Sequence, residues 1–191
     1  MQLVKSRPIP LPVYKSGGWY DDFAVTGAVD PGYSLTGTKQ KYPELIRLSA
    51  SGGNTSYLFF LPTWYKHSNF RLEGVVRRAA GSQCYISFRR VNSQNNWIVV
   101  LLATNDAIEL RKIVANVTTT VASKINVSNT AFHRIEIEAA GPNISLCLDG
   151  SPIVSVSSTD NISGDMFMLG GFDAVANTAQ GEWQYLAIKP L

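Results

Sequence analysis

The chain has 191 residues, with 17 Lys and Arg against 14 Asp and Glu, which gives a formal net charge of +3. Hydrophobic residues make up 45% and charged residues 16%, a composition too apolar for a disordered chain. The small positive charge argues against a nucleic-acid partner. The lack of an apolar run of ~20 residues argues against membrane insertion. We therefore expect one globular domain.

Residues 1–18 are expected to form an extended arm in front of this domain, which spans residues 19–191. Pro8, Pro10 and Pro12 stand at every second position, a spacing that favours polyproline II or edge-strand conformation. The same prolines interrupt any apolar core of signal-peptide type, so no signal peptide is expected in this chain. An extended segment with free backbone groups is suited to docking on another subunit.

From Trp19 onward, short apolar or alternating segments are separated by Gly, Pro, Asn, Asp and Ser. No segment keeps a helical apolar period over three turns, and strands spaced by ~8–12 residues are typical of a sandwich or barrel. We expect strands at residues 19–25, 33–37, 45–50, 55–62, 70–78, 83–91, 96–104, 107–114, 120–127, 132–140, 144–150, 152–158, 166–172 and 182–191. The predicted fold class is all-β.

The clearest pattern runs from residue 132 to residue 150 and predicts two strands joined by a tight turn. Ile135 and Ile137 alternate with charged residues, so one face of the first strand looks into a core. Gly, Pro and Asn at 141–143 then break the run. Apolar residues at alternate positions of 144–148 form the second strand, which ends in Asp-Gly.

This strand pair resembles the closing half of a concanavalin A-like, or laminin G-like, jelly roll. Other pieces that match in order are Asp21-Asp22-Phe23, Phe88-Arg89 before an Asn-rich turn, Asn96-Trp97, Leu110-Arg111-Lys112, and Trp183 and Ile188 in the closing strand. The resemblance covers nearly all of the chain except the arm. It implies an antiparallel two-sheet jelly-roll sandwich. Such domains occur in glycan-binding modules, in some glycoside hydrolases and in many bacteriophage tail and fibre proteins.

A hydrolytic member of that family would carry alternating acidic residues resembling Glu-x-Asp-x-x-Glu, because glycoside hydrolysis uses two positioned carboxylates. The chain has no such motif. Glu136 and Glu138 are the pair most similar to this motif. They alternate with the core residues of the strand, so they should point outward, as charged residues do on any strand with one face in solvent. No Gly-x-Ser-x-Gly elbow is present either. The sequence therefore predicts a domain that is not an enzyme and has no catalytic residues.

Three clusters combine aromatic and polar residues and are candidates for binding a glycan: Trp19-Tyr20-Asp21-Asp22 near the arm, and two clusters further along the chain. Sugar sites typically combine an aromatic platform with amide, carboxylate or guanidinium groups. The candidate ligand-binding residues lie in those two clusters: Trp64, Tyr65 and His67 in the first, and Arg89, Asn92, Asn95, Asn96 and Trp97 in the second. A structural role is the alternative for all three clusters, since Trp at a strand end often packs in a core and Asn clusters often make turns.

The resemblance also implies that a calcium ion can sit at the rim of the sandwich. Acidic residues stand in suitable loops at Asp22, Asp160, Asp165 and Asp173. Calcium needs 6–8 oxygen ligands, and the chain has no compact Asp-x-Asp-x-Asp-Gly loop. We therefore expect no cofactor and no metal, with a structural calcium ion as the alternative.

Two functions from different classes follow as expectations. In the first, the chain is a non-catalytic virion protein of phage tail or fibre type whose jelly roll binds a surface polysaccharide of the host. In the second, it is a purely structural virion component, a capsid decoration or tail assembly protein, that docks on other virion proteins through residues 1–15. In both cases we expect a homo-oligomer in the virion, extracellular when it acts.

Overall fold

The structure, a computed structural model, describes residues 19–21, 34–36, 38–42, 45–51, 55–60, 67–173 and 178–191. The predicted arm, residues 1–18, lies outside the described residues, as do the candidate residues Trp64 and Tyr65. Within the described ranges, no helix is long and apolar enough to cross a bilayer.

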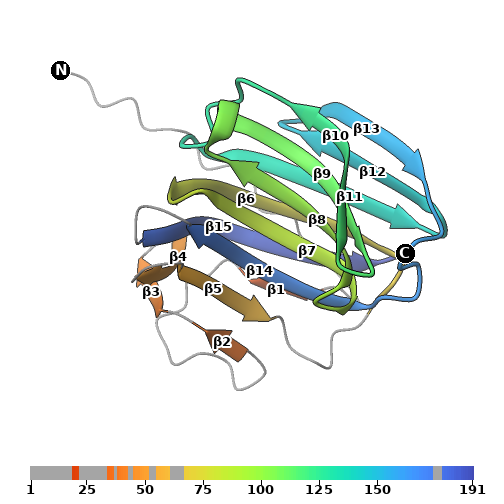
Figure 1. Cartoon of the computed structure of the whole chain (residues 1–191), viewed down its shortest axis with the longest axis horizontal. Coiled ribbons are helices and arrows are strands. Elements are labelled where there is room, and N and C mark those ends of the chain that lie inside the picture. Colours follow the sequence, from red (N-terminus) through yellow and green to blue (C-terminus); the bar gives the residue numbers. More distant parts are fainter. Residues whose placement is uncertain are drawn as a thin grey trace.

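Two antiparallel sheets pack face to face (Figure 1). The eight-stranded sheet has the order β13 (Ser151–Ser157), β12 (Asn143–Leu148), β11 (His133–Ala140), β6 (Phe70–Ala80), β15 (Thr178–Pro190), β4 (Leu45–Ser51) and β3 (Thr38–Tyr42), and β1 (Trp19–Asp21) also pairs with β15. The seven-stranded sheet has the order β10 (Val117–Lys124), β9 (Ala107–Val114), β8 (Asn95–Leu102), β7 (Gln83–Asn92), β14 (Met166–Asp173), β5 (Thr55–Phe60) and β2 (Ser34–Thr36). A short 3-10 turn, η1 (Thr104–Asp106), joins β8 to β9. The predicted all-β, two-sheet jelly-roll sandwich is confirmed.

The last two strands of the chain each lie between two strands that come earlier in the sequence. β14 lies between β7 and β5, and β15 lies between β6 and β4. The pairing of β15 with β6 runs from Gln180 opposite Ala80 to Pro190 opposite Phe70. The centre of each sheet is therefore assembled from segments that are far apart in the sequence, and the sandwich forms only when the C-terminal strands are in place.

The core lies between the sheets and is filled by alternate residues of each strand. On β11, Ile135 and Ile137 are fully buried, as their alternation predicts. The ring of Phe70 packs edge-on against Phe88 and Phe167, with centroids 5.8 and 4.7 Å apart. Aromatic pairs prefer this geometry, and burial of each such side chain contributes about 1.5–3 kcal/mol to the free energy of unfolding.

The structure adds β3, which the sequence pattern does not predict, and it shifts the bounds of β10. This strand covers Val117–Lys124, whereas the sequence pattern predicts 120–127. Ala115 and Asn116 make the turn before it, with φ of +49° and +67°. Alanine seldom adopts the left-handed region, so the sequence pattern did not reveal a turn at this point.

Candidate functional site

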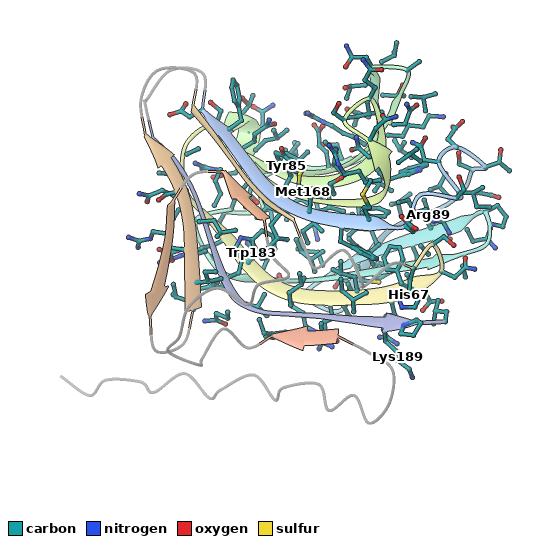
Figure 2. All side chains as sticks on the ribbon, turned by 90° about the horizontal axis from the view of Figure 1, so that it is seen from below. His67, Tyr85, Arg89, Met168, Trp183 and Lys189 are labelled. Atoms are coloured by element: carbon teal, nitrogen blue, oxygen red, sulfur yellow. The ribbon has the colours of Figure 1, made fainter. Side chains whose placement is uncertain are left out.

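The outer face of the seven-stranded sheet, on the side away from the core, is concave. Figure 2 shows β14 as a curved strand, with Tyr85 and Met168 on the inner side of the curve and Trp183 between the two sheets. Cys84 and Ile86 of β7 point into the core, so the residues that alternate with them along the strand point to this concave face.

Cross-strand pairing aligns two rows of residues over the concave face. From β10 to β14, the first row contains Thr120, Arg111, Ile98, Ser87 and Met168. The second row contains Ser123, Glu109, Val100, Tyr85 and Gly170. Neighbouring strands lie about 4.8 Å apart, so each row is about 20 Å long. The face therefore offers an extended strip to a ligand.

Tyr85 leans over a glycine of the neighbouring strand. A Cβ atom built on Gly170 would lie 2.3 Å from Cζ of Tyr85, so any side chain at this position would displace the ring. The tyrosine is half-buried, and no described residue hydrogen-bonds to its hydroxyl group. Burial raises the pKa of Tyr85, although the nearby Arg90 opposes the rise. Tyr85 thus presents part of an aromatic ring and a protonated hydroxyl group to the concavity at neutral pH.

A polar group on β9 and β10 forms the other end of the rows. Nε of Arg111 donates to Oε2 of Glu109 at 2.7 Å. The hydroxyl groups of Thr120 and Ser123 donate to the same carboxylate at 3.1 and 3.4 Å. The side chains of Glu109 and Arg111 are 15% and 23% exposed. Three donors therefore fix the carboxylate, while the ion pair stays accessible from the concavity.

Between these two ends, the middle of the concave face is a buried floor. Val100 and Met168 are 0% and 3% exposed. Ser87 is also buried, and its hydroxyl group donates to Oδ1 of the buried Asn96 at 3.4 Å. Since the floor residues have almost no accessible surface, a ligand on this face would contact the half-buried Tyr85 and the ion pair on β9.

Two residues of the second predicted cluster, Arg89 and Trp97, lie in the interior, which corrects their candidate role. Trp97 is 0% exposed, belongs to the main core, and donates its indole N–H to the carbonyl of Asp160 at 3.0 Å. Arg89 is also 0% exposed, and its guanidinium donates to the carbonyls of Ser68 at 3.0 Å and Gly141 at 2.6 Å. Neither side chain reaches the surface, so neither can contact a sugar in this structure.

The asparagines of this cluster, Asn92, Asn95 and Asn96, hold the turn between β7 and β8. Oδ1 of Asn92 accepts hydrogen bonds from the backbone of Gln94 at 2.9 Å and from Nδ2 of Asn95 at 3.1 Å. Nδ2 of Asn96 donates to the carbonyl of Asn92 at 3.3 Å. Oδ1 of Asn95 accepts from the backbone of Ala115 at 3.0 Å, which ties this turn to the next hairpin. The structure thus favours the turn-forming alternative for these amides.

The first predicted cluster, with Trp64, Tyr65 and His67, lies mostly outside the described residues. His67 is described and half-buried, and its backbone N–H donates to the carbonyl of Asp165 at 3.2 Å. The role of this cluster stays a prediction. Within residues 67–173 and the other described ranges, no group of three His, Cys, Asp or Glu comes together to hold a metal ion. Asp22 lies outside those ranges, so a structural calcium ion stays untested.

No protein-family model and no curated protein sequence matches this chain. Several solved structures share its fold. A carbohydrate-binding module, CBM66 from Bacillus subtilis, superimposes with a TM-score of 0.64 at 18% identity and covers 80% of this chain and 92% of its own. A β-1,3-1,4-glucanase (lichenase) from a mouse hindgut metagenome reaches 0.72 at 9% identity, with 91% and 99% coverage. The Crh5 transglycosylase also reaches 0.72, at 12% identity, with 92% and 85% coverage. The concanavalin A-like jelly-roll fold predicted from the sequence is therefore confirmed.

The same comparison corrects the prediction that the chain is not an enzyme. The lichenase and the transglycosylase are enzymes built on this fold, so the fold gives that prediction no support. Identities of 9% and 12% show the fold alone, and no activity passes from these proteins to this chain. The acidic pair considered in the sequence, Glu136 and Glu138, lies on the outer face of the other sheet, where Glu136 accepts a hydrogen bond from Arg71 at 2.9 Å.

The sequence interpretation missed the residues of the concave face. Tyr85 and Glu109 have the outward parity of their strands, and this could have been read from the alternation in 83–91 and 107–114. Parity does not show that one outer face is curved inward, nor that Gly170 lies beneath Tyr85. Those facts depend on the return of β14 beside β7.

Proposed function

We propose that this domain binds a carbohydrate chain along the concave face of the seven-stranded sheet. The observation that carries the proposal is Tyr85, half-buried over Gly170 and with no described hydrogen-bond partner for its hydroxyl group. An aromatic ring offers a surface for the C–H face of a sugar, and its hydroxyl group can donate to a sugar oxygen.

The rest of the strip has the polar groups that such a ligand needs. Glu109 and Arg111 supply an acceptor and donors in a fixed geometry, because the carboxylate is already held by Thr120 and Ser123. Groups fixed before binding lose little conformational entropy when a ligand arrives. The similarity to a carbohydrate-binding module supports the proposal at the level of the fold.

The finer form of the proposal is that the glycan is a surface polysaccharide bound by a virion tail or fibre protein. This form rests on the family resemblance of the sequence alone. The competing prediction, a structural virion component that docks through residues 1–15, rests on the same resemblance and on the extended character of the arm.

A glycan array, run with and without calcium, tests the proposal. Wild type is compared with Tyr85→Ala, and Ser93→Ala in the exposed β7–β8 turn serves as the matched control. We expect saturable binding of one class of glycan. Tyr85→Ala should weaken it about tenfold, since an aromatic contact contributes about 0.5–1.5 kcal/mol. The control should bind like wild type.

Failure to bind any glycan by a folded wild-type protein would refute the proposal, and so would equal affinities of wild type and Tyr85→Ala. Chromatography of the bound glycan after incubation detects cleavage or transfer, which addresses enzyme activity separately from binding.

A further inference from the structure

On one side of the sandwich the core reaches the surface between two strand edges. β10 ends the seven-stranded sheet, β13 ends the eight-stranded sheet, and the two strands lie next to each other (Figure 1). Among the described residues, the partly buried hydrophobic side chains packed around the main core all belong to these strands: Val121, Ala122, Ile153, Val154 and Val156. We call these five residues the open margin. Ile125, directly after β10, is 57% exposed.

Among the described strands, β13 pairs along one edge only, and its other edge is protected only near its start, where Pro152 and a register irregularity lie. Natural edge strands are commonly blocked by lysine or other charged side chains, yet β13 contains no charged residue. Its pairing with β12 is regular from Val154 to Ser157, and the single irregularity lies toward Pro152. The edge of β10 is interrupted by a register shift between Thr120 and Ala122 and ends at Lys124. β13 is therefore the better acceptor for an added strand.

The arm contains a segment that can pair along one edge only. Residues 7–13 read Arg-Pro-Ile-Pro-Leu-Pro-Val. In an extended strand, alternate residues direct their N–H and C=O groups to the same edge and their side chains to the same face. Proline has no N–H group, so Pro8, Pro10 and Pro12 remove every donor from one edge. The odd-numbered residues keep all donors on the other edge, and the aliphatic side chains of Ile9, Leu11 and Val13 share one face with Arg7.

The arm of the same molecule is too short to reach the free edge of β13. β1 pairs with β15 on the side away from β6, so five strand spacings separate β1 from β13. These spacings amount to about 24 Å, and a strand added beyond β13 would lie about 29 Å from β1. The chain from residue 13 to residue 19 extends to at most about 21 Å. A strand from another copy has no such restriction.

We propose that residues 7–13 of one copy add as an edge strand to β13 of a second copy, with Ile9, Leu11 and Val13 packed on the open margin. The pairing edge supplies backbone hydrogen bonds, and the aliphatic face covers the margin of the core. The prolines then form the new outer edge, which lacks donors and stops further strands from adding. Two copies that exchange arms close as a two-fold dimer. This inference goes beyond the proposed glycan binding and does not depend on it.

Sedimentation equilibrium of the full chain tests the proposal, with substitutions confined to the arm. Ile9→Pro combined with Leu11→Pro removes two donors from the pairing edge. Pro10→Leu, the matched control, leaves that edge intact. We expect wild type to dimerise and the control to match it within twofold, whereas the double variant should dissociate at least tenfold more readily. Circular dichroism should show the same fold for all three proteins.

Hydrogen exchange of the amides in residues 151–157 locates the contact. We expect protection in wild type and the control, and loss of that protection in the double variant. A monomeric wild type would overturn the proposal. Equal dimer dissociation of wild type and the double variant would overturn the proposal as well. In that case either β13 pairs with β13 of the second copy or another surface forms the dimer. A dimer in which the β13 amides exchange freely would also overturn it.

Discussion

The two outer faces of the sandwich are built from the same alternating strands, yet their chemistry differs. On the eight-stranded sheet, oppositely charged residues stand on neighbouring strands, and the buried Glu182 lies directly between Arg47 and Arg77. On the concave face, the two rows that we describe contain one ion pair, Glu109 with Arg111, and the centre is apolar or small. Charge is neutralised locally on the first face and is largely absent from the centre of the second.

A tyrosine on each face shows the same contrast. Tyr185, on the outer face of the eight-stranded sheet, is 2% exposed and donates its hydroxyl hydrogen to Glu73 at 2.5 Å. Tyr85, on the concave face, has no described partner for its hydroxyl group. A buried polar group whose partner is already present has a structural role. A half-buried hydroxyl group without a described partner, such as that of Tyr85, can instead hydrogen-bond to a ligand.

Glu182→Gln should give the largest effect on stability. The substitution keeps the volume of the side chain but removes the charge that Arg47 and Arg77 contact. We expect the free energy of unfolding to fall by about 2–3 kcal/mol, since hydrogen bonds to charged groups are among the stronger ones in proteins. Urea denaturation measures the change. Glu138→Gln, an exposed carboxylate on the same face, is the control and should change stability by less than about 0.5 kcal/mol. Equal effects of the two substitutions would contradict the contrast between buried and exposed charges.

The effect of Glu182→Gln should also depend on pH. Burial alone would raise the pKa of Glu182, but the hydrogen bonds from Arg47 and Arg77 outweigh burial and hold the pKa below its usual range. The folded state therefore favours the ionised form, and its stabilising contribution is present above the unfolded-state pKa. That contribution is lost as the pH falls through the folded-state pKa. The stability difference between wild type and variant should shrink from pH 7 toward pH 3, and a constant difference would contradict this assignment.

Removing one hydroxyl group from each tyrosine compares the two faces directly. Tyr185→Phe should lower the free energy of unfolding by about 1.5 kcal/mol, because Glu73 loses a buried donor. Tyr85→Phe should change stability by less than about 0.5 kcal/mol, since no described group depends on its hydroxyl. Thermal unfolding of both variants beside wild type gives the comparison. The reverse order of effects would show that the concave tyrosine, too, is structural.

Gly170→Ala should have a small effect on stability and a clear effect on binding. The new methyl group takes space now filled by the tip of the Tyr85 ring, and a side-chain tip can move away at low cost. We expect a loss of about 1 kcal/mol or less in the free energy of unfolding. Affinity for the glycan should fall about as far as in Tyr85→Ala. Calorimetry with the glycan found on the array measures both variants, and unchanged affinity in Gly170→Ala would show that the position of the ring is unimportant.

Much of the fold follows from local pattern in the sequence. The alternation of Ile135 and Ile137 with charged residues predicts which face of β11 is buried, and the turn residues at 141–143 predict the hairpin with β12. These features depend on neighbouring residues only. The start of β10 was predicted wrongly because Ala115 adopts a conformation that its side chain does not favour.

The candidate site was less predictable for a physical reason. An Asn-rich turn followed by Trp97 has the composition of a sugar site, but the same composition makes a well-satisfied turn, and the register with β9 and the contact with Asp160 place the indole in the core. Composition gives the polar groups that are present, whereas burial decides which of them meet solvent.

The sequence by itself determined the all-β class and which face of each strand is buried. It also determined that residues 7–13 have hydrogen-bond donors along one edge only. Period-two alternation and the missing N–H of proline are local properties of the chain. Only the tertiary structure decided which strands become neighbours. The return of β14 beside β7 places Gly170 under Tyr85, and the ends of the two sheets bring the edges of β10 and β13 together. Such contacts join residues far apart along the chain, and they are fixed by the packing of the two sheets on one core.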